Sequence, residues 1–203
     1  MSINVELNTK EINQNVMENV MKMLERRKLI KSWSDELTKL GSSVSNDTIF
    51  EIILADKSKY GIYLVNVKLT SIVQGTPLDD YLSNNIDSHK IVIAKDVAKK
   101  VVKQIVGEYK NAEFFFESEM SEDIPSKIFI PKHQIISQAE KDELLSKFSE
   151  LDFGRILLTD MMARYYAAKI GDIFRITRPS FTAGKNIYYR RVVNGSWDIL
   201  FPT

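Results

Sequence analysis

The chain of 203 residues contains no cysteine. This absence excludes disulfide bonds, thiolate zinc sites, iron–sulfur clusters and cysteine nucleophiles. Only two histidines are present, His89 and His133, and they lie too far apart in the sequence to suggest a histidine metal site. We therefore expect no metal and no cofactor.

Long apolar runs and a charge excess are missing as well. No apolar stretch approaches the roughly 20 residues that span a bilayer, so we expect no membrane partner. The polar N-terminus, residues 1–10, is unlike a secretory signal peptide. The 28 Lys and Arg residues nearly balance 27 Asp and Glu residues. The resulting net charge of +1 argues against a histone-like protein and against an acidic disordered chain.

The charge is nevertheless unevenly distributed. Residues 1–127 carry 17 basic and 19 acidic side chains, whereas residues 128–203 carry 11 and 8. The excess lies within residues 155–191, where eight Lys and Arg residues oppose two Asp residues and several tyrosines are interleaved. Arginine suits bidentate contacts with carboxylates and phosphates. This stretch therefore predicts either a nucleic-acid surface with stacking tyrosines or an arginine-rich protein interface.

Hydrophobic periodicity in the first part of the chain predicts alternating helices and strands. The helix over residues 11–30 has a methionine-rich apolar stripe, which we interpret as core. Ser32 is placed to cap the next helix and Gly41 to end it. The expected elements are helices over 11–30, 33–40, 77–82 and 96–108, and strands over 49–55, 60–69, 90–94 and 113–117. This order favours an α/β layer with a mixed sheet.

An acidic, polar segment over residues 117–127 contains Pro125 and is typical of a linker. It predicts two domains, residues 1–124 and residues 125–203. The second is expected to be a small α+β domain, so the whole chain is α+β. Its expected elements are a helix capped by Ser137 with Leu144, Leu145 and Phe148 on its inner face, an extended stretch over 155–158, a helix capped by Asp160, and strands over 173–177 and 186–193 joined by a turn-rich loop.

Sequence motifs of common enzymes are absent. No G-x-S-x-G, G-x-G-x-x-G or P-loop occurs. A metal-dependent nuclease could use Glu51 or Asp56 together with Lys68, because carboxylates on adjacent strands hold Mg²⁺. The second acidic position would be Asn66, whose neutral amide is a poor ligand for a hard dication. The residues therefore predict no catalytic site.

An ordered series of motifs runs through residues 128–191. It consists of Pro131-Lys132-His133, Ser137-x-x-Glu140-Lys141-x-Glu143-Leu144-Leu145, Arg155-Ile156, Asp160-x-x-Ala163-Arg164-Tyr165, Gly171, Ile176-x-Arg178-Pro179-Ser180-x-Thr182-Ala183-Gly184 and Tyr189-Arg190. The series resembles the fifth subunit shared by the eukaryotic nuclear RNA polymerases, whose C-terminal half corresponds to a small subunit of archaeal RNA polymerase. Two positions depart from the family pattern. Met161 replaces the usual proline, and Phe181 replaces the usual acidic residue.

The resemblance implies a non-catalytic subunit of a multisubunit DNA-directed RNA polymerase, acting in transcription. The N-terminal domain would be a nuclease-like α/β jaw and the C-terminal domain an assembly module. The implied partners are the largest subunit, the other polymerase subunits and downstream duplex DNA, with no small-molecule substrate. The implied subunit-interface residues are Arg164, Tyr165, Arg178, Pro179, Ser180, Thr182, Gly184, Tyr189 and Arg190.

In the jaw domain, the segment that faces DNA in the family corresponds to residues 95–100. The implied DNA-proximal residues are Lys95, Ala98, Lys99 and Lys100, whereas Asp96 would oppose phosphate. The alternative function is a free-standing nucleic-acid-binding protein that uses the basic C-terminal surface. A cellular subunit would act in the nucleus. The Lys-, Ile- and Asn-rich composition also suits a large DNA virus, in which case the subunit would serve viral transcription in the virion and host cytoplasm.

Overall fold

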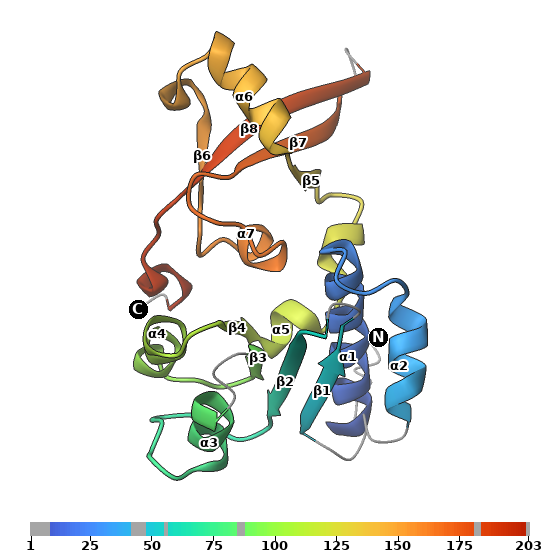
Figure 1. Ribbon diagram of the computed structural model, residues 1–203, viewed down its shortest axis with the longest axis vertical. Coiled ribbons are helices and arrows are strands. Elements are labelled where there is room, and N and C mark those ends of the chain that lie inside the picture. The colour runs from blue at the N-terminus through green and yellow to red at the C-terminus, as the bar shows by residue number, and fades with distance from the viewer. Residues whose placement is uncertain (1–8, 42–47, 55–56, 85–87, 181–183, 202–203) are drawn as a thin grey trace, which may run out of the picture. The chain divides into compact units, whose positions relative to one another are not determined.

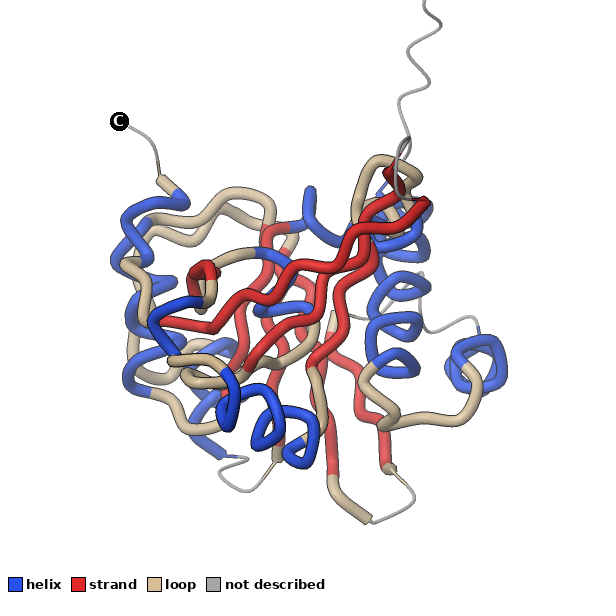
Figure 2. The backbone as a smooth tube through the Cα atoms, turned by 90° about the horizontal axis from the view of Figure 1, so that it is seen from above, coloured by secondary structure: helices blue, strands red, loops and turns tan. Residues whose placement is uncertain are grey.

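The computed structural model of the protein describes residues 9–41, 48–54, 57–84, 88–180 and 184–201. The chain divides into two compact units, Met1–Glu122 and Asp123–Thr203, which we call unit 1 and unit 2. The predicted boundary lies two residues further along the chain. Figure 2 shows the helices and strands of the described ranges. None of the helices in the described ranges is both long and apolar enough to cross a bilayer.

Unit 1 is built on a mixed four-stranded sheet (Figure 1). Its strands are β1 (Ile49–Ile53), β2 (Lys59–Val65), β3 (His89–Ala94) and β4 (Ala112–Phe116), in the order β1-β2-β3-β4. β1 is antiparallel to β2, and the other neighbours are parallel. The predicted hairpin and the predicted mixed sheet are confirmed.

Both faces of this sheet are buried in its inner strands β2 and β3, whereas the edge strand β1 exposes alternate residues. Phe114 and Phe115 are adjacent on β4, so they point to opposite faces, and both are inaccessible to solvent. The helices are α1 (Thr9–Arg26), α2 (Trp33–Leu40), α3 (Pro77–Asn84) and α4 (Lys99–Glu108). α1 buries its apolar stripe, including Met17, Met21 and Met23, which confirms that the methionines are core. Ser32 Oγ accepts a hydrogen bond from the Asp35 amide and Gly41 ends α2 at φ 54°, as predicted.

Several predictions for unit 1 were wrong in their boundaries. The helix predicted over 11–30 ends at Arg26, and the strand predicted over 60–69 ends at Val65. α4 begins at Lys99 instead of Asp96, because the preceding residues form backbone hydrogen bonds with a distant segment. The Leu69 amide donates to the Asp96 carbonyl at 2.9 Å, and the Ala98 amide donates to the Leu69 carbonyl at 2.7 Å. Leu69 and Val97 thereby form a short parallel bridge. Sequence periodicity does not detect such long-range pairing.

The segment predicted as a linker, 117–127, contains structure that belongs to unit 1. α5 (Glu117–Met120) follows β4 directly, and a 3₁₀ turn, η2 (Ile124–Ser126), comes after it. Met120 is fully buried, and its carbonyl accepts a hydrogen bond from Asn19 Nδ2 at 2.9 Å. The first part of this acidic segment therefore packs against α1.

Unit 2 contains a second mixed sheet and two short helices. Its strands are β5 (Lys132–Ile135), β6 (Gly154–Leu157), β7 (Ile173–Ser180) and β8 (Gly184–Val193), in the order β5-β7-β8-β6. β6 is parallel to β8, and the other pairs are antiparallel. The helices are α6 (Gln138–Lys147) and α7 (Met161–Tyr165), and 3₁₀ turns occur at η3 (Glu150–Asp152) and η4 (Trp197–Leu200). The small α+β unit is as predicted.

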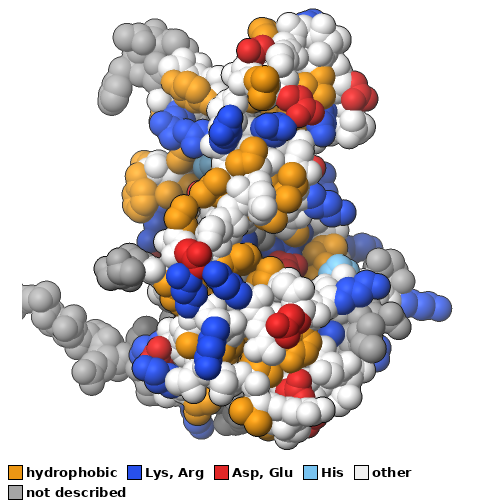
Figure 3. All heavy atoms as spheres, turned by 90° about the vertical axis from the view of Figure 1, so that its left-hand side faces the viewer, with side chains coloured by type: hydrophobic (Ala, Val, Ile, Leu, Met, Phe, Trp, Pro, Cys, Tyr) orange, Lys and Arg blue, Asp and Glu red, His pale blue; other side chains and the backbone are white. Residues whose placement is uncertain are grey.

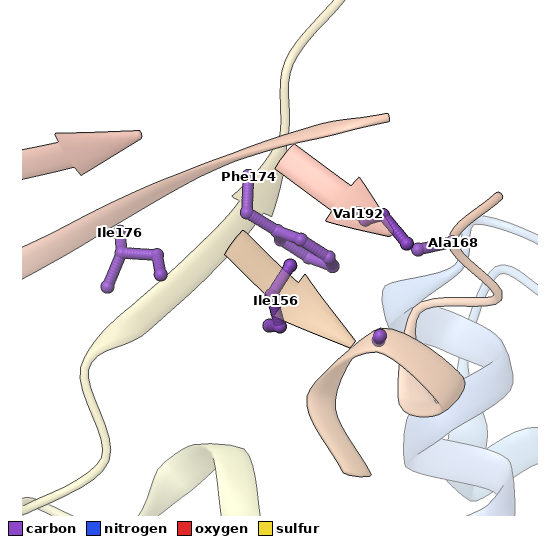
Figure 4. Packing of buried hydrophobic residues seen from close by; sticks show 6 residues of the cluster. Ile156, Ala168, Phe174, Ile176 and Val192 are labelled. Carbon is purple, nitrogen blue, oxygen red and sulfur yellow. The ribbon is translucent and has the colours of Figure 1, made fainter. Parts of the chain in front are cut away.

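The core of unit 2 is small. One cluster contains Ile156, Ala163, Ala168, Phe174, Ile176 and Val192, and Ile136, Met162, Tyr165 and Ile173 are buried as well. The Phe174 ring and the Ile156 side chain face one another within it (Figure 4). Asp160 Oδ1 accepts a hydrogen bond from the Met162 amide at 2.8 Å and starts α7, which confirms the predicted cap. This arrangement brings α7 onto one face of the sheet.

The other helix of unit 2 differs from expectation. Ser137 caps α6 as predicted, but α6 has no buried residue, and Phe148 of the predicted inner face is 52% exposed. Polar contacts link α6 to β7 and to the residues just before it. Lys141 Nζ donates to the Gly171 carbonyl at 2.9 Å, and the Arg175 guanidinium donates to Glu140 Oε1 at 2.8 Å. The helix therefore keeps its apolar side chains near the surface.

Candidate functional site

The β7–β8 hairpin extends beyond the rest of its sheet (Figure 1). The two strands pair from Ile173–Arg191 to Ser180–Gly184, whereas β5 reaches only Thr177 of β7 and β6 reaches only Arg190 of β8. Within the described ranges, no strand therefore pairs with the outer edge of residues 178–180 or 184–189. We call these residues the hairpin arm. The predicted turn-rich loop was wrong in extent, since the strands continue through most of it, and residues 181–183 lie outside the described ranges.

Several predicted interface residues lie together on or beside the arm. Arg178, Pro179 and Gly184 are exposed, and Gly184 has φ 70°, a conformation that favours glycine. The Arg178 guanidinium lies 5.7 Å from the centre of the Tyr188 ring. The Tyr189 ring packs edge-on against Phe153. Arg190 is exposed at the base of the arm; the side chains of Ser180 and Thr182 lie outside the described part.

Two predicted interface residues are placed inside unit 2. Arg164 is 7% exposed and Tyr165 is 2% exposed. Arg164 Nε donates to the Thr159 carbonyl at 3.0 Å, and its guanidinium lies over the Trp197 ring. These contacts hold the α7 region to the C-terminal turn. The sequence pattern predicted both residues as interface residues, but in the structure both side chains are buried and contribute to the inside of unit 2.

The arm also exposes apolar side chains that the sequence-based site did not include. Ile187 and Tyr188 are among the exposed large hydrophobic residues of unit 2. The detectable signal is the run Ile187-Tyr188-Tyr189, because consecutive large apolar residues in a strand must occupy both faces. In Figure 3, hydrophobic and basic side chains are interspersed over unit 2.

His133 is a structural residue beside this surface. Its Nδ1 lies 2.7 Å from the Pro131 carbonyl oxygen, and its ring packs edge-on against Phe174. Burial lowers the pKa of His133, and the nearby Arg178 and Arg190 guanidinium groups act in the same direction, against the opposing effects of the Pro131 hydrogen bond and Asp160. The imidazole therefore favours its neutral form next to the basic hairpin.

In unit 1, three predicted DNA-proximal residues are exposed at or just before the start of α4. Lys95, Lys99 and Lys100 are exposed, and Ala98 is the N-cap residue with no side-chain hydrogen bond. The opposing carboxylate of Asp96 is engaged by Lys68, with Nζ and Oδ2 3.0 Å apart. The ion pair offsets the negative charge that Asp96 adds near the start of α4.

The residues that a metal-dependent nuclease site would require lie far apart in the structure. Glu51 pairs with Gly61 in the β1–β2 ladder, and Asn66 follows five residues later, about 16 Å along an extended chain. Lys68 contacts Asp96, and Asp56 lies outside the described residues. No group of three His, Asp or Glu residues within the described ranges is arranged to hold a metal ion.

Comparison with known proteins gives the same picture as the motifs. The family described as RNA polymerase Rpb5, C-terminal domain, matches residues 122–192, which lie almost wholly in unit 2. DNA-directed RNA polymerase subunit 5 of Acanthamoeba polyphaga mimivirus is 30% identical over 149 residues, which cover 72% of each chain. The chain belongs to the DNA-directed RNA polymerase subunit 5 family.

The members of this family differ in how much of this chain they match. The subunit shared by RNA polymerases I, II and III of Dictyostelium discoideum is 31% identical over 121 residues, 56% of this chain and 61% of the relative. Subunit Rpo5 of the archaeon Nitrosopumilus maritimus is 40% identical over 72 residues, which are 34% of this chain but 87% of the relative. A family member can therefore consist of little more than one stretch the size of unit 2.

Proposed function

We propose that the chain is a non-catalytic subunit of a multisubunit DNA-directed RNA polymerase. Unit 2 is the assembly domain, and unit 1 is a nuclease-like jaw domain beside downstream DNA. The match of the polymerase family to residues 122–192 carries this proposal, because it coincides with a compact unit that has a small core and an exposed hairpin arm. The match to the mimivirus subunit extends it beyond unit 2 and supports a virus-encoded origin, with action in the virion and host cytoplasm; a cellular subunit would act in the nucleus.

The assembly domain docks on the largest subunit through the hairpin side of unit 2. Arg178, Pro179 and Arg190 provide exposed contacts, with Gly184 setting the turn and Tyr189 packed beneath. Ser180 and Thr182 complete the predicted motif. Arg164 and Tyr165, which are 7% and 2% exposed, would support this surface from inside unit 2. Arginine is favoured at interfaces because its planar head binds carboxylates in a bidentate manner.

The jaw domain contributes a basic face to downstream duplex DNA. Lys95, Lys99 and Lys100 surround the N-terminal end of α4, next to Ala98. Cations and exposed backbone amides at a helix N-terminus favour phosphate without reading sequence. The Lys68–Asp96 contact reduces the local repulsion of phosphate. Holding DNA in this way requires no catalytic group in unit 1.

The alternative is a free-standing nucleic-acid-binding protein, favoured by the basic stretch over residues 155–191. Affinity purification of the tagged chain from its native source separates the two. The polymerase proposal expects the largest polymerase subunits to co-purify, while the isolated chain binds duplex DNA weakly. Tight duplex binding by the isolated chain with a steep salt dependence, and no polymerase subunits in the eluate, would support the alternative instead.

A further inference from the structure

The hairpin arm exposes a large apolar side chain on each of its two faces. Tyr188 pairs with Ile176, which belongs to the core, so Tyr188 lies on the core face of the sheet. Ile187 is the adjacent residue and points to the opposite face. The two residues are 48% and 56% exposed. A single binding partner that touched only one face would leave the other apolar side chain in water.

Each face of the arm also carries a cation beside its apolar side chain. Arg178 lies two residues after Ile176 and stacks on Tyr188, which places it on the core face. Lys185 lies two residues before Ile187, on the opposite face. Both cations are exposed, and neither forms an ion pair within the described residues. The two faces therefore present the same pair of chemical features.

These features favour a protein as the occupant over a nucleic acid. A two-stranded ribbon is marginally stable by itself in water, so an arm of this kind gains from being covered. Phosphate groups would satisfy Arg178 and Lys185 but would leave Ile187 without apolar contact. A protein cleft can offer apolar walls and carboxylates on both sides of a ribbon, which satisfies all four side chains.

We propose that the hairpin arm inserts into a cleft of another polymerase subunit, and that both walls of this cleft are apolar and acidic. The partner would thus grip both faces of the β7–β8 ribbon. This inference rests on the proposed function and adds to it the chemistry and geometry of the docking site.

The test uses one charged substitution on each face, Ile187→Glu and Tyr188→Glu, in the tagged full-length chain. Polymerase subunits recovered from the native source are quantified for each variant. Each substitution should lower the recovery by about tenfold or more, because a carboxylate is placed against an apolar, acidic wall. Ile53→Glu is the matched control, since Ile53 is 65% exposed in a strand of unit 1 and should leave the recovery unchanged.

A second pair of variants gives an independent reading that does not depend on apolar contacts. Arg178→Glu reverses the charge on the core face and Lys185→Glu on the opposite face, and both should also lower the recovery. Circular dichroism and thermal unfolding confirm that each variant is folded, and Tyr188→Phe and Ile187→Val should retain wild-type recovery.

The outcomes separate the inference from the proposed function. If only the variants of one face lose polymerase subunits, or if neither face matters, the two-sided cleft is wrong while the polymerase assignment stands. If the unmutated chain recovers no polymerase subunits, the proposed function fails and the cleft fails with it. If the charge reversals weaken duplex DNA binding and leave subunit recovery unchanged, the arm is a nucleic-acid surface.

Discussion

Both units contain a mixed four-stranded sheet, but β4 of unit 1 and β8 of unit 2 differ in how their two faces are covered. In unit 1, the adjacent residues Phe114 and Phe115 are buried on the two faces of β4. In unit 2, the adjacent residues Ile187 and Tyr188 are exposed on the two faces of β8. A sheet covered on both sides stabilises its own unit, whereas uncovered apolar side chains are available to a partner.

The helices account for this difference. α1 of unit 1 buries a continuous apolar stripe, while α6 of unit 2 buries no residue and is linked to the sheet side by Lys141 and Glu140. The unit with the smaller core is also the one that matches the polymerase family profile.

The largest expected effect comes from truncating the core of unit 2. Phe174→Ala should destabilise unit 2 by about 3–5 kcal/mol, because a small core cannot fill the cavity. Trp33 lies in unit 1 and Trp197 lies in unit 2. During urea unfolding, the fluorescence of a Trp33→Phe background therefore reports unit 2, and that of a Trp197→Phe background reports unit 1. Phe174→Ala should lower the urea midpoint of the Trp197 signal and leave that of the Trp33 signal unchanged. An equal shift of the Trp33 signal would show that the two units unfold as one.

The next effect concerns a buried ion pair in unit 1. The Arg27 guanidinium binds Glu113 through two hydrogen bonds, of 2.9 and 2.6 Å, and the Arg27 side chain is 4% exposed. Glu113→Gln should destabilise unit 1 by about 2–3 kcal/mol, because a neutral amide makes weaker hydrogen bonds to the guanidinium group than a carboxylate does. The urea midpoint of the Trp33 signal measures this change. Glu143→Gln removes an exposed pair with Lys147 in α6, and we expect it to leave the stability of unit 2 unchanged.

A smaller effect is expected from adding one methyl group to β2. A Cβ atom at Gly61 would lie 2.6 Å from Tyr81 Oη and 3.0 Å from Tyr81 Cε2, inside the packed core. Gly61→Ala should therefore destabilise unit 1 by about 1–3 kcal/mol, measured by thermal unfolding. Gly107 of α4 has open space around the same position, so Gly107→Ala should stabilise unit 1 by about 0.5 kcal/mol. A neutral Gly61→Ala would contradict the close packing of this sheet face.

The smallest effect is a pH dependence confined to unit 2. The pKa of His133 is lowered in the folded state by burial, so the unfolded chain binds the proton more tightly. The stability of unit 2 should consequently fall as the pH drops below the ordinary histidine value of 6.5. Urea midpoints of the Trp197 signal at pH 7.5 and pH 5.5 measure the loss. His133→Gln should reduce the dependence of the urea midpoint on pH. If this variant kept the pH dependence of the wild type, His133 would not be its cause.

Local features of the sequence predicted the elements well. Ser32, Ser137 and Asp160 cap helices as expected, because a cap involves neighbours within three residues. The start of α4 and the packing of Met120 were missed, since both depend on partners far away in the sequence. For the site, the motif series identified the hairpin, but it did not distinguish the exposed Arg178 from the buried Arg164.

The sequence by itself determined the two-part organisation, the order of most helices and strands, and the family, but it missed α5 and β5. Periodicity, capping residues and ordered motifs carry this information because they act over short distances or repeat along the chain. Only the tertiary structure decided which side chains face solvent. Burial of Arg164 and exposure of Ile187 follow from which elements cover each face of a sheet, and the lack of a strand beside the hairpin arm is a property of the folded unit.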